Sequence, residues 1–134
     1  MERQSTAPHK RQNLLTGEWV LVSPHRTDRP WLGERSDARV DRPPAYDPAC
    51  YLCPGNERAG GARNPQYDGT YVFTNDYPAL LPPAENGTAQ YGSGEVPEYG
   101  TCRVVCFSPR HDLHLGAMQE AQVESVVACW SQQY

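Results

Sequence analysis

The sequence predicts a small α+β protein in which loops make up much of the chain. Three short segments are dense in β-branched and aromatic residues, which is typical of strands: residues 17–23, 70–74 and 103–107. A C-terminal segment from Ala121 onward carries apolar residues at the three- and four-residue intervals of an amphipathic helix. The 134 residues include 13 Pro and 11 Gly, so we expect short elements and a modest core.

The first predicted strand, residues 17–23, follows a polar N-terminal segment and ends at Pro24. Residues 1–12 show no apolar pattern and are predicted to form a loose arm. Directly after the strand come His25, Arg26 and Arg29. Basic side chains beyond a strand end are placed to meet an anion, although a solvated turn has the same composition.

A cysteine turn, Asp47 to Asn56 with the sequence DPACYLCPGN, is the strongest local motif. Cys50 and Cys53 are two residues apart, a spacing that lets two thiolates hold one tetrahedral ion. Such a pair supplies half of a zinc site, so neutral imidazole or further thiolate partners are needed, and two histidines follow a predicted strand end. His111 is our first choice and His114 the second. A redox pair and ordinary free thiols are the alternatives, although no βαβ unit typical of a redox pair is visible.

The second predicted strand, residues 70–74, ends at Asn75 and Asp76. An Asn-Asp pair at a strand end can bind a ribose or a base edge, and it is also common in plain turns. Residues 82–101 have no apolar periodicity and are predicted to be a flexible loop.

The third predicted strand, residues 103–107, is followed by the helical segment, whose apolar stripe is expected to face the core. The stripe contains Ala121, Val123, Val126, Val127 and Trp130. No Gly or Pro stops the helical pattern before Tyr134, so we expect a chain that is cut short.

Charge and cysteine content indicate which partners and which cellular compartment to expect. The net charge of −4 gives no support for a nucleic-acid or membrane-surface partner. Eleven of the twelve basic residues are arginines, and ten of the twelve lie in residues 1–64, which suggests a phosphate-binding face or merely an arginine-rich codon usage. The sequence shows neither a 20-residue apolar run nor a signal peptide, so a cytoplasmic protein with reduced thiols is expected. The remaining thiols are expected to be small buried residues: Cys102, Cys106 and Cys129.

Four phrases in this order resemble the N-terminal part of galactose-1-phosphate uridylyltransferases: LLTGEWVLVSPHRTDRPW, YDPACYLCPGN, NPQYDGTYVFTNDYPAL and CRVVCFSPRH. The resemblance covers about residues 10–134 and is interrupted only at 82–101. It implies that residues 1–134 form an incomplete N-terminal domain of a histidine-triad-like antiparallel half-barrel with a flanking helix. The family moves a uridylyl group between UDP-glucose and galactose 1-phosphate through a uridylyl-histidine, and its members are homodimers.

Carried over by position, the resemblance makes Cys50, Cys53 and His111 zinc ligands. It also implies a set of positions that contact the UDP-sugar: Arg26, Thr27, Asp28, Arg29, Ala59, Asn75 and Asp76. The arginines would contact phosphate, reaching across the dimer to the site of the partner. Zinc would be a structural brace rather than a Lewis acid.

No catalytic residue is assigned, because the His-Pro-His-Pro-His segment that carries the family's nucleophile and fourth zinc ligand does not occur in this sequence. We therefore expect these residues alone to be unable to form the uridylyl-enzyme. Two other functions stay open. One is a related nucleotidyltransferase or phosphorylase acting on ADP-sugars or dinucleotides, and the other is a zinc-binding module without catalysis.

Overall fold

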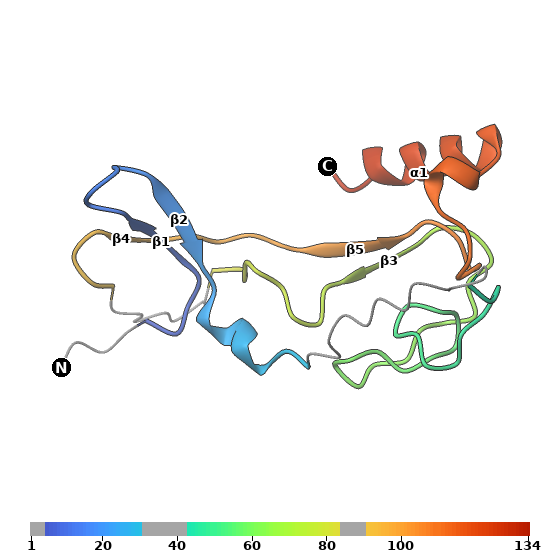
Figure 1. Cartoon of the computed structure of the whole chain (residues 1–134), viewed down its shortest axis with the longest axis horizontal. Coiled ribbons are helices and arrows are strands. Elements are labelled where there is room, and N and C mark those ends of the chain that lie inside the picture. The colour runs from blue at the N-terminus through green and yellow to red at the C-terminus, as the bar shows by residue number, and fades with distance from the viewer. Residues whose placement is uncertain (1–4, 31–42, 84–90) are drawn as a thin grey trace. The chain divides into compact units, whose positions relative to one another are not determined.

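The computed structural model describes residues 5–30, 43–83 and 91–134. Its elements follow this order: β1 (His9–Gln12), β2 (Trp19–Val22), the 3-10 helix η1 (Pro24–Asp28), β3 (Tyr71–Thr74), β4 (Glu95–Pro97), β5 (Arg103–Cys106), the 3-10 helix η2 (Leu115–Ala117) and α1 (Glu120–Ser131) (Figure 1). The chain forms two compact units. The first contains Met1–Arg29 and Tyr77–Arg103, and the second contains Pro30–Asp76 and Val104–Tyr134.

The first unit is built on an antiparallel sheet with strand order β2-β1-β4. In its register, Gln12 of β1 lies opposite Trp19 of β2. The prediction of a loose arm is wrong for His9–Gln12, since β1 is the middle strand of this sheet. Its sequence, HKRQ, has no apolar alternation, so only its two neighbouring strands identify it.

β4 lies inside the segment that was predicted to be a flexible loop, residues 82–101. Part of that segment, residues 84–90, is outside the described residues. Glu95 explains why a strand forms here: its carboxylate accepts hydrogen bonds from Arg11 on β1 and from the Gly92 backbone N–H at 2.8 Å. Arg11 and Glu95 are 84 residues apart in the chain, so local sequence patterns cannot predict this contact.

Glu95→Gln is expected to reduce the acid sensitivity of the first unit. The Gly92 N–H, and then Arg11, hold the pKa of the Glu95 carboxyl below its ordinary value. The carboxylate therefore stabilises the folded state above that ordinary value, and the contribution is lost as the pH falls through the lowered pKa. Urea unfolding of wild type and variant at pH 7 and pH 3 should show a smaller pH difference for the variant. Glu98→Gln is the control, because Glu98 pairs with the exposed Lys10; an equal response of both variants would contradict this assignment.

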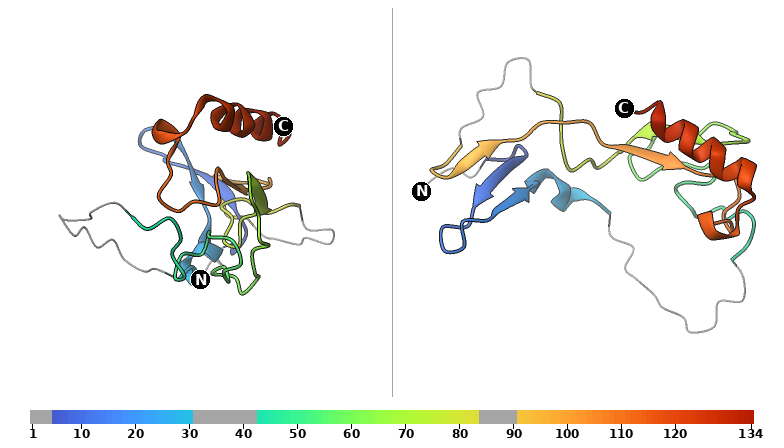
Figure 2. Two further views of the ribbon diagram at one scale, coloured as in Figure 1. Left: turned by 90° about the vertical axis from the view of Figure 1, so that its right-hand side faces the viewer. Right: turned by 90° about the horizontal axis from the view of Figure 1, so that it is seen from above.

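The second unit contains β3, β5 and α1. In this unit the ribbon of α1 lies beside that of β5 (Figure 2). Val126 and Cys129 on α1 are buried, and the ring of Phe107, just after β5, meets the Trp130 ring edge-on at 5.7 Å. The predicted core-facing stripe is therefore only partly correct, because Val127 is 53% and Trp130 40% exposed.

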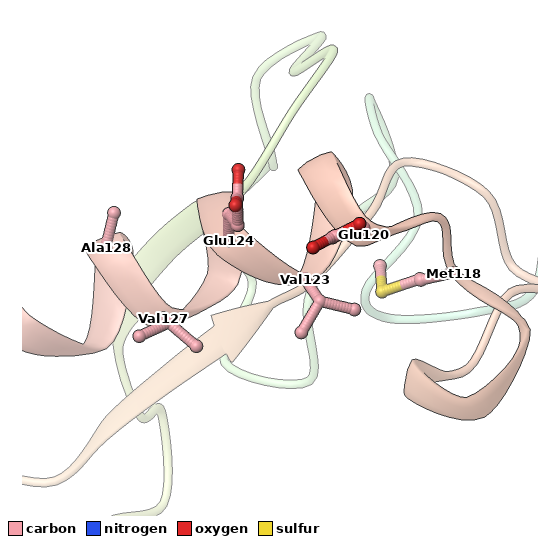
Figure 3. A pocket seen from close by; sticks show the side chains of 6 residues that line it. All are labelled: Met118, Glu120, Val123, Glu124, Val127 and Ala128. Atoms are coloured by element: carbon pink, nitrogen blue, oxygen red, sulfur yellow. The ribbon is translucent and has the colours of Figure 1, made fainter.

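The helix α1 runs over Glu120–Ser131 and so ends before Tyr134. The Gln119 backbone N–H, at its start, donates to Gln122 Oε1 at 2.9 Å, which caps the first turn. Figure 3 shows a pocket along α1, with Val123 and Val127 on one side of the helix and Met118 beside its first turn.

The predicted class, a mixed α and β chain with antiparallel pairing and one α-helix, is confirmed in the described residues. The strands expected at residues 17–23, 70–74 and 103–107 are present as β2, β3 and β5, each slightly shorter than predicted. All five cysteines are free thiols. Among the described helices, none is long and apolar enough to cross a membrane.

Candidate functional site

The cysteine turn and a distant histidine form one cluster in the second unit. The Sγ atoms of Cys50 and Cys53 and a ring nitrogen of His111 all lie within 4.8 Å of one another. The Cys53 Sγ atom is 3.6 Å from His111 Nδ1. Zn–S bonds of about 2.3 Å and Zn–N bonds of about 2.0–2.1 Å in a tetrahedron place ligand atoms roughly 3.5–3.8 Å apart. These three residues therefore fit one tetrahedral metal ion, whereas His114 is not part of the cluster.

Two asparagine side chains hold the cysteine turn in this shape. Asn56 Nδ2 donates to the backbone carbonyls of Asp47 and Cys50, at 2.9 and 2.8 Å. Asn64, which is only 3% exposed, donates to the carbonyls of Tyr51 and Cys53, at 2.9 and 3.1 Å. The carbonyls of Asp47 and Cys53 also accept backbone N–H groups of the same turn, from Cys50 and Asn56, so the asparagine side chains add further hydrogen bonds to it. Sequence analysis missed both asparagines, because turn asparagines usually act on their own neighbours.

A backbone hydrogen bond brings His111 to the turn. The His111 N–H donates to the carbonyl of Ala45 at 2.8 Å, so the segment after β5 lies beside the segment that enters the cysteine turn. The cluster opens on a pocket that is also lined by Tyr67 and Cys106. The prediction that Cys106 and Cys129 are buried is confirmed, and Cys102 is half-buried.

The chemistry of the thiols depends on their burial. Desolvation raises the pKa of the Cys53 thiol and of the Cys106 thiol, because burial favours the neutral form. A metal ion binds the thiolate, so its binding at Cys53 must displace a proton. The site is thus expected to bind metal more weakly as the pH falls.

Asn64→Ala is expected to lower the free energy of unfolding by about 1–3 kcal/mol, because a buried side chain loses its two hydrogen bonds to the carbonyls of Tyr51 and Cys53. Urea denaturation monitored by circular dichroism measures this change. Asn13→Ala is the matched control, since Asn13 Oδ1 accepts one bond from the Leu15 N–H at an exposed turn. Equal losses for the two variants would show that Asn64 does not hold the turn.

The predicted substrate-contacting residues fall into two groups. In the first unit, Arg26, Thr27 and Asp28 lie on η1 and Arg29 follows it. The 3-10 helix is fixed by hydrogen bonds from Ser23 Oγ to the Ala79 carbonyl and from His25 Nε2 to the Pro78 carbonyl, both at 2.7 Å. Within the part of the chain that the structure describes, the buried Nε of Arg26 has no hydrogen-bond partner.

In the second unit, Ala59, Asn75 and Asp76 lie near one another. Residues 56–64 form a small hairpin, with hydrogen bonds from Arg58 N to Ala62 O and from Asn64 N to Asn56 O. Arg58 Nε donates to Asp76 Oδ2 at 3.1 Å, which joins this hairpin to the end of β3. Ala59 follows Arg58 directly and so lies at the same junction.

The chain is thus an α+β protein with a Cys-Cys-His cluster that could hold a metal ion, and its strand-end Asn-Asp pair lies beside the hairpin of residues 56–64. Residues 1–134 match the model of the family described as "Galactose-1-phosphate uridyl transferase, N-terminal domain". This chain belongs to that family.

Curated relatives from several organisms are named galactose-1-phosphate uridylyltransferase. A Cryptococcus neoformans protein is 45% identical over 131 residues, which is 94% of this chain and 34% of the relative. The Saccharomyces cerevisiae and Haemophilus influenzae proteins are each 42% identical over 94% of this chain, and the match covers 37% of each. The chain spans about a third of the length of these curated relatives.

Proposed function

We propose that this protein is a nucleotidyltransferase of galactose metabolism, which transfers UMP between UDP-glucose and galactose 1-phosphate. The observation that carries the proposal is the family match over all 134 residues. In the proposed reaction, a histidine that is not among these 134 residues attacks UDP-glucose, takes the uridylyl group and releases glucose 1-phosphate. Galactose 1-phosphate then accepts the group. A histidine nucleophile divides one difficult displacement into two easier steps.

In this proposal Cys50, Cys53 and His111 hold a zinc ion as a structural brace. Two thiolates and an imidazole form a donor set that suits zinc, and the 3.6 Å separation of Cys53 Sγ and His111 Nδ1 fits tetrahedral geometry. When bound, zinc would stabilise the turn that leads into the hairpin of residues 56–64. The chain's own asparagines, Asn56 and Asn64, already hold the backbone of that turn.

We assign the anionic part of the substrate to the residues around η1. Arg26 and Arg29 would contact phosphate oxygens, with Thr27 and Asp28 between them. The buried Arg26 Nε supports this role, because a buried donor without a partner within the described chain is costly and an anion would satisfy it. Ala59, Asn75 and Asp76 would contact the nucleoside part.

For the fold of the whole protein, we propose the histidine-triad-like half-barrel, and for its assembly a homodimer in the cytoplasm. The antiparallel pairing and the one α-helix of the described residues are compatible with that fold. Support for a second copy comes from apolar side chains exposed on the hairpin of β1 and β2: Leu14, Leu15, Trp19, Val20 and Leu21. An apolar surface of this kind is typical of an interface.

Calorimetric titration of the purified, metal-loaded protein with UDP-glucose and with ADP-glucose tests the assignment. We expect binding of UDP-glucose and at least tenfold weaker binding of ADP-glucose. Preference for ADP-glucose would support a related ADP-sugar enzyme instead. Tight zinc with no binding of either sugar nucleotide would support a zinc-binding module without catalysis.

A further inference from the structure

Arg58 forms an ion pair with Asp76 that is mostly shielded from water. The Arg58 Nε atom is 3.1 Å from Asp76 Oδ2, and the two side chains are 13% and 17% exposed. Solvent screens such a pair less than it screens a surface pair. Removing either partner would therefore leave the other charge poorly solvated and unpaired. Arg58, on the hairpin of residues 56–64, thus binds the carboxylate of Asp76, which lies two residues after the end of β3.

Two aromatic residues of β3 fix the guanidinium in place. Arg58 Nη1 donates to the Tyr71 hydroxyl at 3.4 Å, and Arg58 Cζ lies 4.2 Å from the centre of the Phe73 ring. A planar guanidinium can stack on a ring and donate along its edge at the same time, whereas an ammonium group cannot. Arg58 is therefore suited to orient Asp76 as well as to neutralise it.

Gly60 allows the hairpin backbone to approach this carboxylate closely. A Cβ atom added at Gly60 would lie 2.8 Å from Asp76 Cβ and 3.0 Å from Asp76 Oδ1. The first distance is below the normal contact limit, and Asp76 Cβ is anchored to the backbone, so the side chain could not simply rotate away. The absence of a side chain at residue 60 thus leaves the room that Asp76 needs in its present position beside the hairpin.

We propose that Arg58 and Gly60 are positioning residues that orient the Asp76 carboxylate to accept a hydrogen bond from a hydroxyl group of the UDP-sugar. This inference rests on the proposed function. Arg58 also offsets the negative charge of Asp76, which would otherwise repel the diphosphate of the same ligand. Neither residue needs to contact the substrate itself.

The experiment compares Arg58→Gln, Arg58→Lys and Gly60→Ala in the protein as its gene encodes it, purified with its metal. Arg63→Gln is the matched control, because Arg63 lies on the same hairpin and donates to the Gly55 carbonyl rather than to Asp76. The measurements are kcat and KM for UDP-glucose, its dissociation constant by calorimetry, metal content and melting temperature. We expect KM and the dissociation constant to rise at least tenfold for Arg58→Gln and Gly60→Ala, with metal content unchanged. Arg58→Lys should recover part of this loss, and Arg63→Gln should stay within about twofold of wild type.

A double-mutant cycle separates positioning from general stability. If Arg58 acts through Asp76, Arg58→Gln adds little to the loss already caused by Asp76→Asn. Additive losses, or an Arg58→Gln variant that binds UDP-glucose as well as Arg63→Gln does, would overturn the positioning role while leaving the proposed function intact. A wild-type protein that binds no UDP-sugar would instead overturn the proposed function, and the positioning role with it.

Discussion

Replacing Cys53 by serine is expected to abolish stoichiometric metal binding. Cys53 is 2% exposed and its Sγ atom is next to the ring of His111, so its loss removes one of three clustered ligands from the inside of the site. A serine hydroxyl does not supply the thiolate that zinc prefers. We expect metal affinity to fall by at least about 100-fold, because even residues that only support ligands contribute about 10–100-fold. Metal content by mass spectrometry and competition with a chromophoric chelator measure the change.

Cys102→Ser is the matched control for this prediction, since Cys102 is a half-buried free thiol outside the cluster. It should keep the metal. The Cys53→Ser protein should also unfold more readily, because metal binding free energy contributes to the stability of a small site. Full metal retention by Cys53→Ser would contradict the assignment of the cluster.

The second large effect is expected for Arg26→Gln, which should raise the KM for UDP-glucose by about 10–100-fold. Charge-assisted hydrogen bonds to phosphate contribute about 1.5–3 kcal/mol, and the buried Nε of Arg26 is suited to make one. Steady-state kinetics with varied UDP-glucose measure the change. Lys10→Gln, which removes one positive charge from the same unit, is the control. If both variants have the same KM, Arg26 does not bind the phosphate.

Local sequence patterns predicted the elements that carry apolar residues. β2, β3, β5 and α1 were found because their residues are β-branched, aromatic or regularly spaced. β1 and β4 were missed, since HKRQ and EVP form strands only through pairing with segments far along the chain. The spacing of apolar residues correctly identified the apolar side of α1. It could not predict that Val127 and Trp130 on that side are exposed.

The candidate site divides in the same way. The spacing of Cys50 and Cys53 is local and predicted two members of the Cys-Cys-His cluster, and His111 was chosen for its place after a strand and for the family resemblance. Asn64 could not be chosen, because its role depends on two carbonyls that lie 11 and 13 residues earlier in the chain. The contact of Arg58 with Asp76 is equally non-local. The roles of the seven substrate-contacting residues stay predictions.

The most direct measurement is the transfer reaction itself. The protein as its gene encodes it, loaded with zinc, is incubated with UDP-glucose and radiolabelled galactose 1-phosphate, and the products are separated by chromatography. We expect labelled UDP-galactose and an equal amount of glucose 1-phosphate, with neither product formed when UDP-glucose is omitted. Zinc-loaded, folded protein that binds UDP-glucose but forms no UDP-galactose would contradict the proposed uridylyl transfer.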